Sequence, residues 1–143
     1  TEGRRLYDDV MSRAAVILEL VGKIEARSPE TVKEYRERLE AKLREVLSDT
    51  TIDEQRILTE AAIFADKVAV AEETVRLRSH FEQLKALLNA EEPSGRKMDF
   101  LVQEMNRETN TIGSKASDSQ IAYMVVDIKA EIEKIREQIQ NIE

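Results

Sequence analysis

The most regular stretch of the chain spans residues 121–142 and reads IAYMVVDIKAEIEKIREQIQNI. Its apolar residues recur at alternating spacings of four and three, which is the a/d pattern of a coiled coil. Isoleucine at both a and d favours three or more strands when such helices pair in parallel. The same stripe is equally compatible with packing inside its own domain, so the sequence leaves both arrangements open. The residues of this seam are Ile121, Val125, Ile128, Ile132, Ile135, Ile139 and Ile142.

The composition favours helices in the rest of the chain as well. The 143 residues are 41% hydrophobic and 36% charged, and only four glycines and two prolines interrupt them. This combination predicts an all-α fold, and the periodic apolar residues argue against disorder. Three tyrosines, three phenylalanines and no tryptophan argue against a β-sandwich or barrel. The absence of cysteine excludes disulfides and thiolate metal sites, and no apolar run is long enough to span a membrane.

Local signals predict an antiparallel helical hairpin over residues 1–48, within a first domain of residues 1–50. Apolar spacing predicts helices over residues 4–27 and 28–47. Ser28-Pro29-Glu30 has the residue types of a helix start, with serine as N-cap and proline in the first helical position. The connection between these two helices is so short that they are expected to fold back on each other.

A helical bundle is predicted for the second domain, residues 51–143. Thr51 and Glu54 form a capping-box pattern, which predicts that a helix starts there. A further helix is predicted over residues 96–112, and the bundle ends in the long heptad-patterned C-terminal helix. The interruptions are predicted at a weak spot at 68–70, a loop at 93–95 and a turn at 113–119.

The charge excludes one mode of nucleic-acid binding. The net charge is −7 and no segment is a basic block, so charge alone would not hold a polyanion. Such binding would need a local patch, an oligomer or a bound cation. The sequence lacks the glycine-rich phosphate loops, the HExxH pattern and the GxSxG pattern. The remaining candidates for chemistry are carboxylates, amides and the single histidine, His80.

The predicted helix 96–112 presents two unusual faces. At about 100° per residue, Glu108 and Glu104 lie about 40° and about 80° from the centre of the apolar face. A carboxylate so close to a core needs a cation, a donor or a metal, so it marks either a site or a salt bridge to a neighbouring helix. The opposite face suits contacts with phosphates and bases, or it is a plain solvated surface. It carries Asp99, Gln103, Asn106 and Asn110, with Arg96 and Arg107 beside them.

A second constellation consists of Asp66, Glu73 and His80, spaced seven and seven residues apart. On one continuous helix they would share a face, where two carboxylates and an imidazole could bind a divalent ion or move a proton. A helix break at 68–70 would remove Asp66 from this line. The Glu72-Glu73 pair is also compatible with an ordinary solvated surface.

Residues 95–112, GRKMDFLVQEMNRETNTI, with Ser114-Lys115 after them, resemble the signature of the bacterial YicC-like endoribonuclease family. Residues 58–67 and 72–80 resemble the same family, as does the ending EKIREQIQNIE at 133–143. Members of that family carry a further N-terminal half, so the chain is expected to correspond to their C-terminal half.

The resemblance implies cytoplasmic bacterial proteins that cleave single-stranded RNA with a divalent cation, magnesium or manganese, and act in RNA decay. It also implies a homo-oligomer, such as a hexamer, and the isoleucine helix independently fits such an assembly through trimeric contacts. His80, Glu104 and Glu108 become the candidate catalytic residues, with proton transfer assigned to His80. Because Asp99 and Glu108 lie on opposite faces of one helix, they could share an ion only across a subunit contact. The candidate metal ligands are Glu73, Asp99, Glu104 and Glu108, and the candidate RNA-binding residues are Arg96, Lys97, Gln103, Asn106, Arg107, Asn110 and Lys115.

Two other functions fit the sequence. The chain could be an RNA-binding adaptor without chemistry of its own, which presents RNA to another nuclease. It could also be an oligomerisation module that only assembles. An endoribonuclease is distinguished from both by cleavage that requires metal and Glu108.

Overall fold

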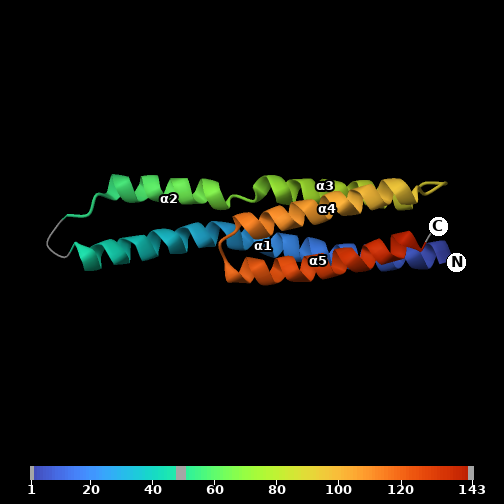
Figure 1. Cartoon of the computed structure of the whole chain (residues 1–143), viewed down its shortest axis with the longest axis horizontal. Coiled ribbons are helices and arrows are strands. Elements are labelled where there is room, and N and C mark those ends of the chain that lie inside the picture. The colour runs from blue at the N-terminus through green and yellow to red at the C-terminus, as the bar shows by residue number, and fades with distance from the viewer. Residues whose placement is uncertain (1, 48–50, 142–143) are drawn as a thin grey trace.

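Every regular element is an α-helix in the computed structural model, which describes residues 2–47 and 51–141 (Figure 1). The all-α prediction is therefore confirmed. No helix of the described part is both long enough and apolar enough to cross a membrane. The helices are α1 (Glu2–Val46), α2 (Glu54–Val68), α3 (Ala71–Leu88), α4 (Gly95–Lys115) and α5 (Ser119–Gln140).

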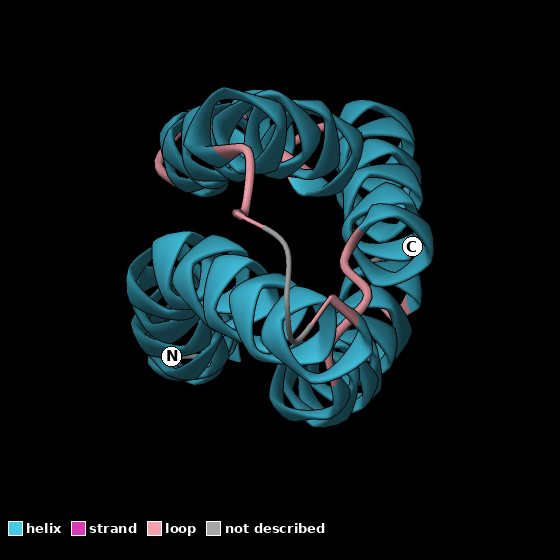
Figure 2. Ribbon diagram, turned by 90° about the vertical axis from the view of Figure 1, so that its left-hand side faces the viewer, coloured by secondary structure: helices cyan, strands magenta, loops and turns pink. Residues whose placement is uncertain are grey.

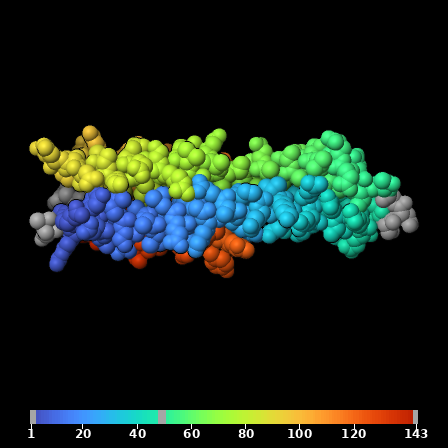
Figure 3. Space-filling model, turned by 180° about the vertical axis from the view of Figure 1, so that it is seen from behind, coloured from blue at the N-terminus to red at the C-terminus, as the bar shows by residue number. Residues whose placement is uncertain are grey.

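The helices form a four-helix bundle that continues into a two-helix arm. The first half of α1 packs with α3, α4 and α5, while its second half pairs with α2 beyond the end of α4 and α5 (Figure 1). Viewed along the long axis, the helices run roughly parallel to one another (Figure 2). From behind, the arm, defined as residues 29–46 of α1 together with α2, makes up one whole end of the molecule (Figure 3).

The predicted hairpin turn at Arg27-Ser28 is wrong, because α1 continues through Pro29. Proline removes one backbone donor, which usually ends or kinks a helix. Arg27 compensates by reaching across the proline, with its two Nη atoms 2.8 Å from the carboxylate oxygens of Glu34. The hydroxyl of Thr31 donates to the carbonyl of Ser28 at 2.7 Å. A hairpin does exist, but it is formed by α1 and α2, where Tyr35 stacks on Phe64 with ring centroids 4.0 Å apart.

The other helix ends agree in part with the sequence. Helix α2 starts two residues later than the Thr51 capping box predicts, because Asp53 accepts from the backbone N of Arg56 at 3.2 Å. The break at 68–70 and the loop at 93–95 are confirmed, although α4 already begins at Gly95. The predicted turn at 113–119 is shorter than expected, since α4 runs to Lys115 and Asp118 caps α5. Gly113 allows this close packing: a Cβ atom there would lie 3.2 Å from Cγ1 of Val125.

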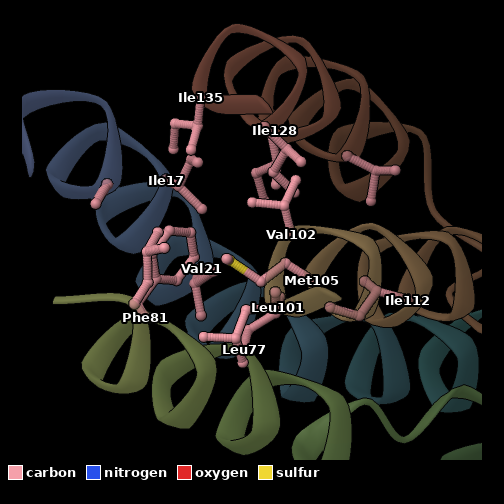
Figure 4. Close-up of a cluster of buried hydrophobic side chains, with 14 of the residues drawn as sticks. Ile17, Val21, Leu77, Phe81, Leu101, Val102, Met105, Ile112, Ile128 and Ile135 are labelled. Atoms are coloured by element: carbon pink, nitrogen blue, oxygen red, sulfur yellow. The ribbon is translucent and has the colours of Figure 1, made fainter. Parts of the chain in front are cut away.

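The isoleucine seam of α5 is buried inside its own bundle. No described member of the seam is more than 7% exposed. Figure 4 shows Ile128 and Ile135 facing the core, where Ile17 of α1 and Val102 of α4 also lie. Each fully buried isoleucine contributes about 1.5–3 kcal/mol through removal of its side chain from water. A seam already covered by α1 and α4 is not free to pair with other subunits, so trimeric contacts through the isoleucine seam are wrong; Ile142 lies outside the described residues.

Candidate active site

His80, Glu104 and Glu108 come together between α3 and α4. One potential ligand atom of each lies within 4.8 Å of those of the other two. Glu104 and Glu108 are neighbours on α4 because residues four apart share a helix face, and the packing of α3 on α4 brings His80 beside them. His80 and Glu104 are half-buried, and Glu108 is buried. These are the three residues that the sequence analysis names as catalytic.

The donor set of this cluster fits a divalent cation. Carboxylate oxygens are the ligands that Mg²⁺ and Mn²⁺ prefer, and an imidazole nitrogen extends the set toward transition metals. Nδ1 of His80 is buried and has no hydrogen-bond partner among the described residues. Because a buried polar atom without a partner is costly, this nitrogen is suited to a proton or to a ligand that enters the site.

Arg76 of α3 explains how Glu108 can be buried. Its Nε lies 2.9 Å from Oε1 of Glu108, whose side chain is 10% exposed. The Glu108 carboxylate raises the pKa of the Arg76 guanidinium, which therefore stays charged. Glu104 forms an ion pair with Arg107 of the same helix, whose Nη1 lies 3.6 Å from the Glu104 carboxylate. The salt bridge to a neighbouring helix that the sequence left open is thus present for Glu108, whereas Glu104 pairs with an arginine of its own helix, and both pairs coexist with the cluster.

Glu73 does not belong to the cluster of His80, Glu104 and Glu108, but consecutive ion pairs connect it to that cluster. Its side chain is 2% exposed, and Nζ of Lys115 lies 2.7 Å from its Oε1. Burial opposes ionisation of Glu73, yet Lys115, the backbone and Arg76 outweigh it and hold the pKa of that carboxyl below its usual range. Arg76 is therefore shared between Glu73 and Glu108, while Lys115 binds Glu73. The residues form a continuous network in the order Lys115, Glu73, Arg76, Glu108.

Two acidic candidates lie elsewhere. Asp99 lies on the α5 side of α4, with Nε of Arg136 at 3.7 Å, and it accepts from Nε2 of Gln103 at 2.9 Å. The expected line of Asp66, Glu73 and His80 is wrong, because the break after Val68 places the exposed Asp66 on a different helix.

The candidate RNA-binding residues fall into two surface features. A shallow groove of about 500 Å³ runs along the outer face of α4 and includes Gln103, Asn106, Arg107 and Asn110. Arg96 and Lys97 instead line a cavity of about 630 Å³ between α3 and the start of α4. Lys115 belongs to neither, since it is bound to Glu73.

Sequence reasoning missed Arg76, although a signal for it existed. Glu73, Arg76 and His80 follow one another at spacings of three and four on α3, so they share a helix face. An arginine between two candidate site residues on one face marks it as their counter-charge.

Most of the chain matches a known protein family. A family model described as the C-terminal part of endoribonuclease YicC-like proteins matches residues 24–143. The chain belongs to this YicC-like family. The resemblance of its α4 segment to that family is thereby confirmed.

Two relatives show how far the YicC-like likeness extends. The chain is 50% identical over 143 residues to a protein of Clostridioides difficile named probable endoribonuclease YicC. It is 36% identical over 142 residues to a Haemophilus influenzae protein of the same name. Each match covers 99% of this chain but 49% of the relative. The chain therefore spans about half the length of the curated relatives it matches.

Proposed function

We propose that this chain carries the catalytic site of a metal-dependent endoribonuclease that cleaves single-stranded RNA in bacterial RNA decay. The observation that carries the proposal is the convergence of His80, Glu104 and Glu108, with one ligand atom of each within 4.8 Å of the others. The names of the relatives support an endoribonuclease as the class of enzyme.

In this proposal Glu104 and Glu108 hold a divalent cation, Mg²⁺ or Mn²⁺. A bound cation would neutralise charge on the phosphate and make an attacking hydroxyl more acidic. Arg76 orients the Glu108 carboxylate within the α3–α4 interface, because its Nε donates to Oε1 of Glu108 at 2.9 Å. Glu73 in turn positions the guanidinium of Arg76. The Glu73 carboxylate can do so because Lys115 holds it in place.

His80 moves the proton in the proposed reaction. Its Nδ1 is buried beside the carboxylates without a hydrogen-bond partner among the described residues, and an imidazole exchanges protons near neutral pH. It accepts the proton of the attacking nucleophile, which is either a water molecule or the ribose 2′-hydroxyl. An RNA with a single 2′-deoxyribose at the cleavage position separates the two, because only attack by the 2′-hydroxyl is blocked.

The RNA backbone and bases would lie along α4. Gln103, Asn106 and Asn110 offer amide groups that can hydrogen-bond to unpaired bases, and Arg107 offers a guanidinium to a phosphate. Arg96 and Lys97 extend the positive charge to the start of the helix.

The test is cleavage of end-labelled single-stranded RNA, with Mn²⁺ or with EDTA. We expect defined fragments with Mn²⁺, and none with EDTA or in Glu108→Gln. The matched control is Glu133→Gln, which removes an exposed carboxylate of α5 and should cleave like the wild type. Retained RNA binding without any metal-dependent cleavage would refute the catalytic proposal and favour an adaptor. Circular dichroism establishes that each variant is folded.

The proposal also includes a cytoplasmic location and self-association, as the family resemblance implies. Assembly would have to use surfaces other than the buried isoleucine seam. The outer face of α5 exposes Tyr123 and Val126, which are 75% and 63% exposed. Light scattering of the wild type and of Tyr123→Ser tests whether this face contributes, and an unchanged mass would exclude it.

A further inference from the structure

The cavity between the end of α3 and the start of α4 has a composition that suits a nucleobase. Its volume is about 630 Å³. Phe100 lies in it and is 61% exposed, while the other two phenylalanines are buried at 3% (Phe81) or stacked on Tyr35 (Phe64). A single exposed apolar residue is ordinary on a protein surface, so exposure alone carries no argument. The lining consists of Gln83, Ala86, Leu87, Arg96, Lys97, Phe100 and Leu101.

Positive charge surrounds this aromatic ring. Arg96 and Lys97 precede Phe100 by four and three residues, so all three belong to one side of α4. Neither cation forms an ion pair within the described residues, whereas Arg76, Arg107 and Lys115 all have carboxylate partners. In a chain of net charge −7, an aromatic ring flanked by two unpaired cations suits an anion that carries a planar ring.

The cavity is also next to the proposed catalytic cluster. Phe100 lies one helical turn from Glu104 on α4, and Gln83 lies one turn from His80 on α3. One turn of helix is about 5.4 Å, so a nucleotide in the cavity would be a near neighbour of the phosphate at the cluster.

We infer that this cavity is a base-stacking subsite, in which an unpaired base of the RNA stacks on Phe100 while Arg96 and Lys97 bind its phosphate. The inference rests on the proposed function and deepens it, because it assigns the nucleotide beside the cleaved phosphate to a specific surface. Gln83 at the edge of the cavity supplies an amide that can hydrogen-bond to the base. A second copy of this chain would be the alternative occupant, and the test below separates it from RNA.

The chain provides its own reporter for the test. It contains no tryptophan, so Phe100→Trp introduces a single tryptophan, whose fluorescence can be excited apart from that of the three tyrosines, at the proposed contact. We expect a short single-stranded oligoadenylate to quench this fluorescence in a saturable way, measured in the Glu108→Gln background so that the RNA stays intact. Leu58→Trp is the control, because Leu58 is exposed on α2 in the arm, outside the cavity, and its signal should not change.

Affinity gives a second readout. Stacking of a base on an aromatic ring contributes to the free energy of binding, so Phe100→Ala should weaken oligoadenylate binding by roughly tenfold. Phe100→Tyr keeps the aromatic ring and should not weaken it. With an oligonucleotide that lacks the base at the stacked position, wild type and Phe100→Ala should bind equally.

The outcomes distinguish this inference from the proposed function. RNA that binds by anisotropy without quenching Phe100→Trp overturns the subsite and leaves the nuclease proposal intact. Quenching without metal-dependent cleavage of the wild type supports the subsite and refutes the nuclease. If Phe100→Ala lowers the mass of the protein by sedimentation and leaves RNA affinity unchanged, the occupant is a second copy and the inference is wrong. Absence of any RNA binding overturns both.

Discussion

Two glycines inside helices should respond in opposite ways to replacement by alanine. Gly22 lies in the middle of α1, and a Cβ atom there would be 3.9 Å from Nη2 of Arg78, an ordinary van der Waals distance. Gly113 lies in the last turn of α4, and a Cβ atom there would be 3.2 Å from Cγ1 of Val125. The structure therefore offers a matched pair of substitutions that differ in the space available to one methyl group.

The expected sizes follow from two opposing effects. Gly22→Ala gains helix propensity at no steric cost, so it should raise the free energy of unfolding by about 0.8–1.0 kcal/mol. At Gly113 the propensity gain is smaller because the last turn of a helix is only partly constrained. Overpacking costs about 1–3 kcal/mol, so Gly113→Ala should lower the free energy of unfolding by roughly 1 kcal/mol in total.

The assay is urea unfolding followed by far-ultraviolet circular dichroism, for both glycine variants, for Val125→Ala and for Gly113→Ala combined with Val125→Ala. Removing the Val125 methyl groups removes the clash, so Gly113→Ala should cost less in that background, with a coupling of about 1 kcal/mol. The reasoning is refuted if Gly113→Ala stabilises the protein as much as Gly22→Ala. A coupling energy of zero would show that the added methyl group at position 113 does not clash with Val125.

Three further predictions concern charge, core and metal. Arg27 holds the pKa of Asp118 and of Glu34 below their usual ranges, so these carboxylates stabilise the fold above about pH 4 and lose that contribution as the pH falls through their lowered values. Arg27→Met should therefore flatten the acid-dependent loss of stability, as measured by unfolding at a series of pH values; an unchanged slope would contradict this. Met105 is fully buried, and Met105→Ala should lower the free energy of unfolding by about 3 kcal/mol in the same urea assay, whereas a loss below about 1 kcal/mol would indicate that the site collapses. Glu104→Gln should weaken Mn²⁺ binding by roughly tenfold or more in calorimetry, and wild-type affinity would remove Glu104 from the proposed ligands.

Helical periodicity was sufficient to predict which faces are buried, but it did not identify what covers them. The sequence correctly predicts an apolar stripe from Ile121 to Ile139. The stripe alone does not identify its partner, because a coiled coil between subunits and a helical bundle within one chain require the same pattern. The choice depends on whether α1 and α4 are long enough and placed to cover it, which is a property of tertiary packing. For the same reason Glu104 and Glu108 could be placed on one face of α4, while their approach to His80 depends on how α3 packs against it.

Pro29 shows a limit of a different kind. Ser28-Pro29-Glu30 has the residues of a helix start, and local rules alone predict one there. The helix continues through the proline, and Arg27, two residues before it, binds Glu34 beyond it in α1 and Asp118 at the start of α5. Asp118 is 91 residues away in sequence. No window of local sequence contains that contact.

The distribution of charge suggests how an acidic chain could hold RNA. Glu73 is neutralised by Lys115 and Arg76, and Asp99 lies beside Arg136, so these acids do not face an incoming phosphate alone. Glu104 and Glu108 belong to the cluster at which the phosphate would be cleaved, and in the proposed function a divalent cation would offset them. Metal binding would then turn a repulsive position into an attractive one on the same helix that carries Arg107, Arg96 and Lys97. RNA affinity should consequently rise with Mn²⁺ in the wild type and lose this dependence when Glu104 and Glu108 are both changed to Gln, because neutral amides remove the repulsion and the cation site together.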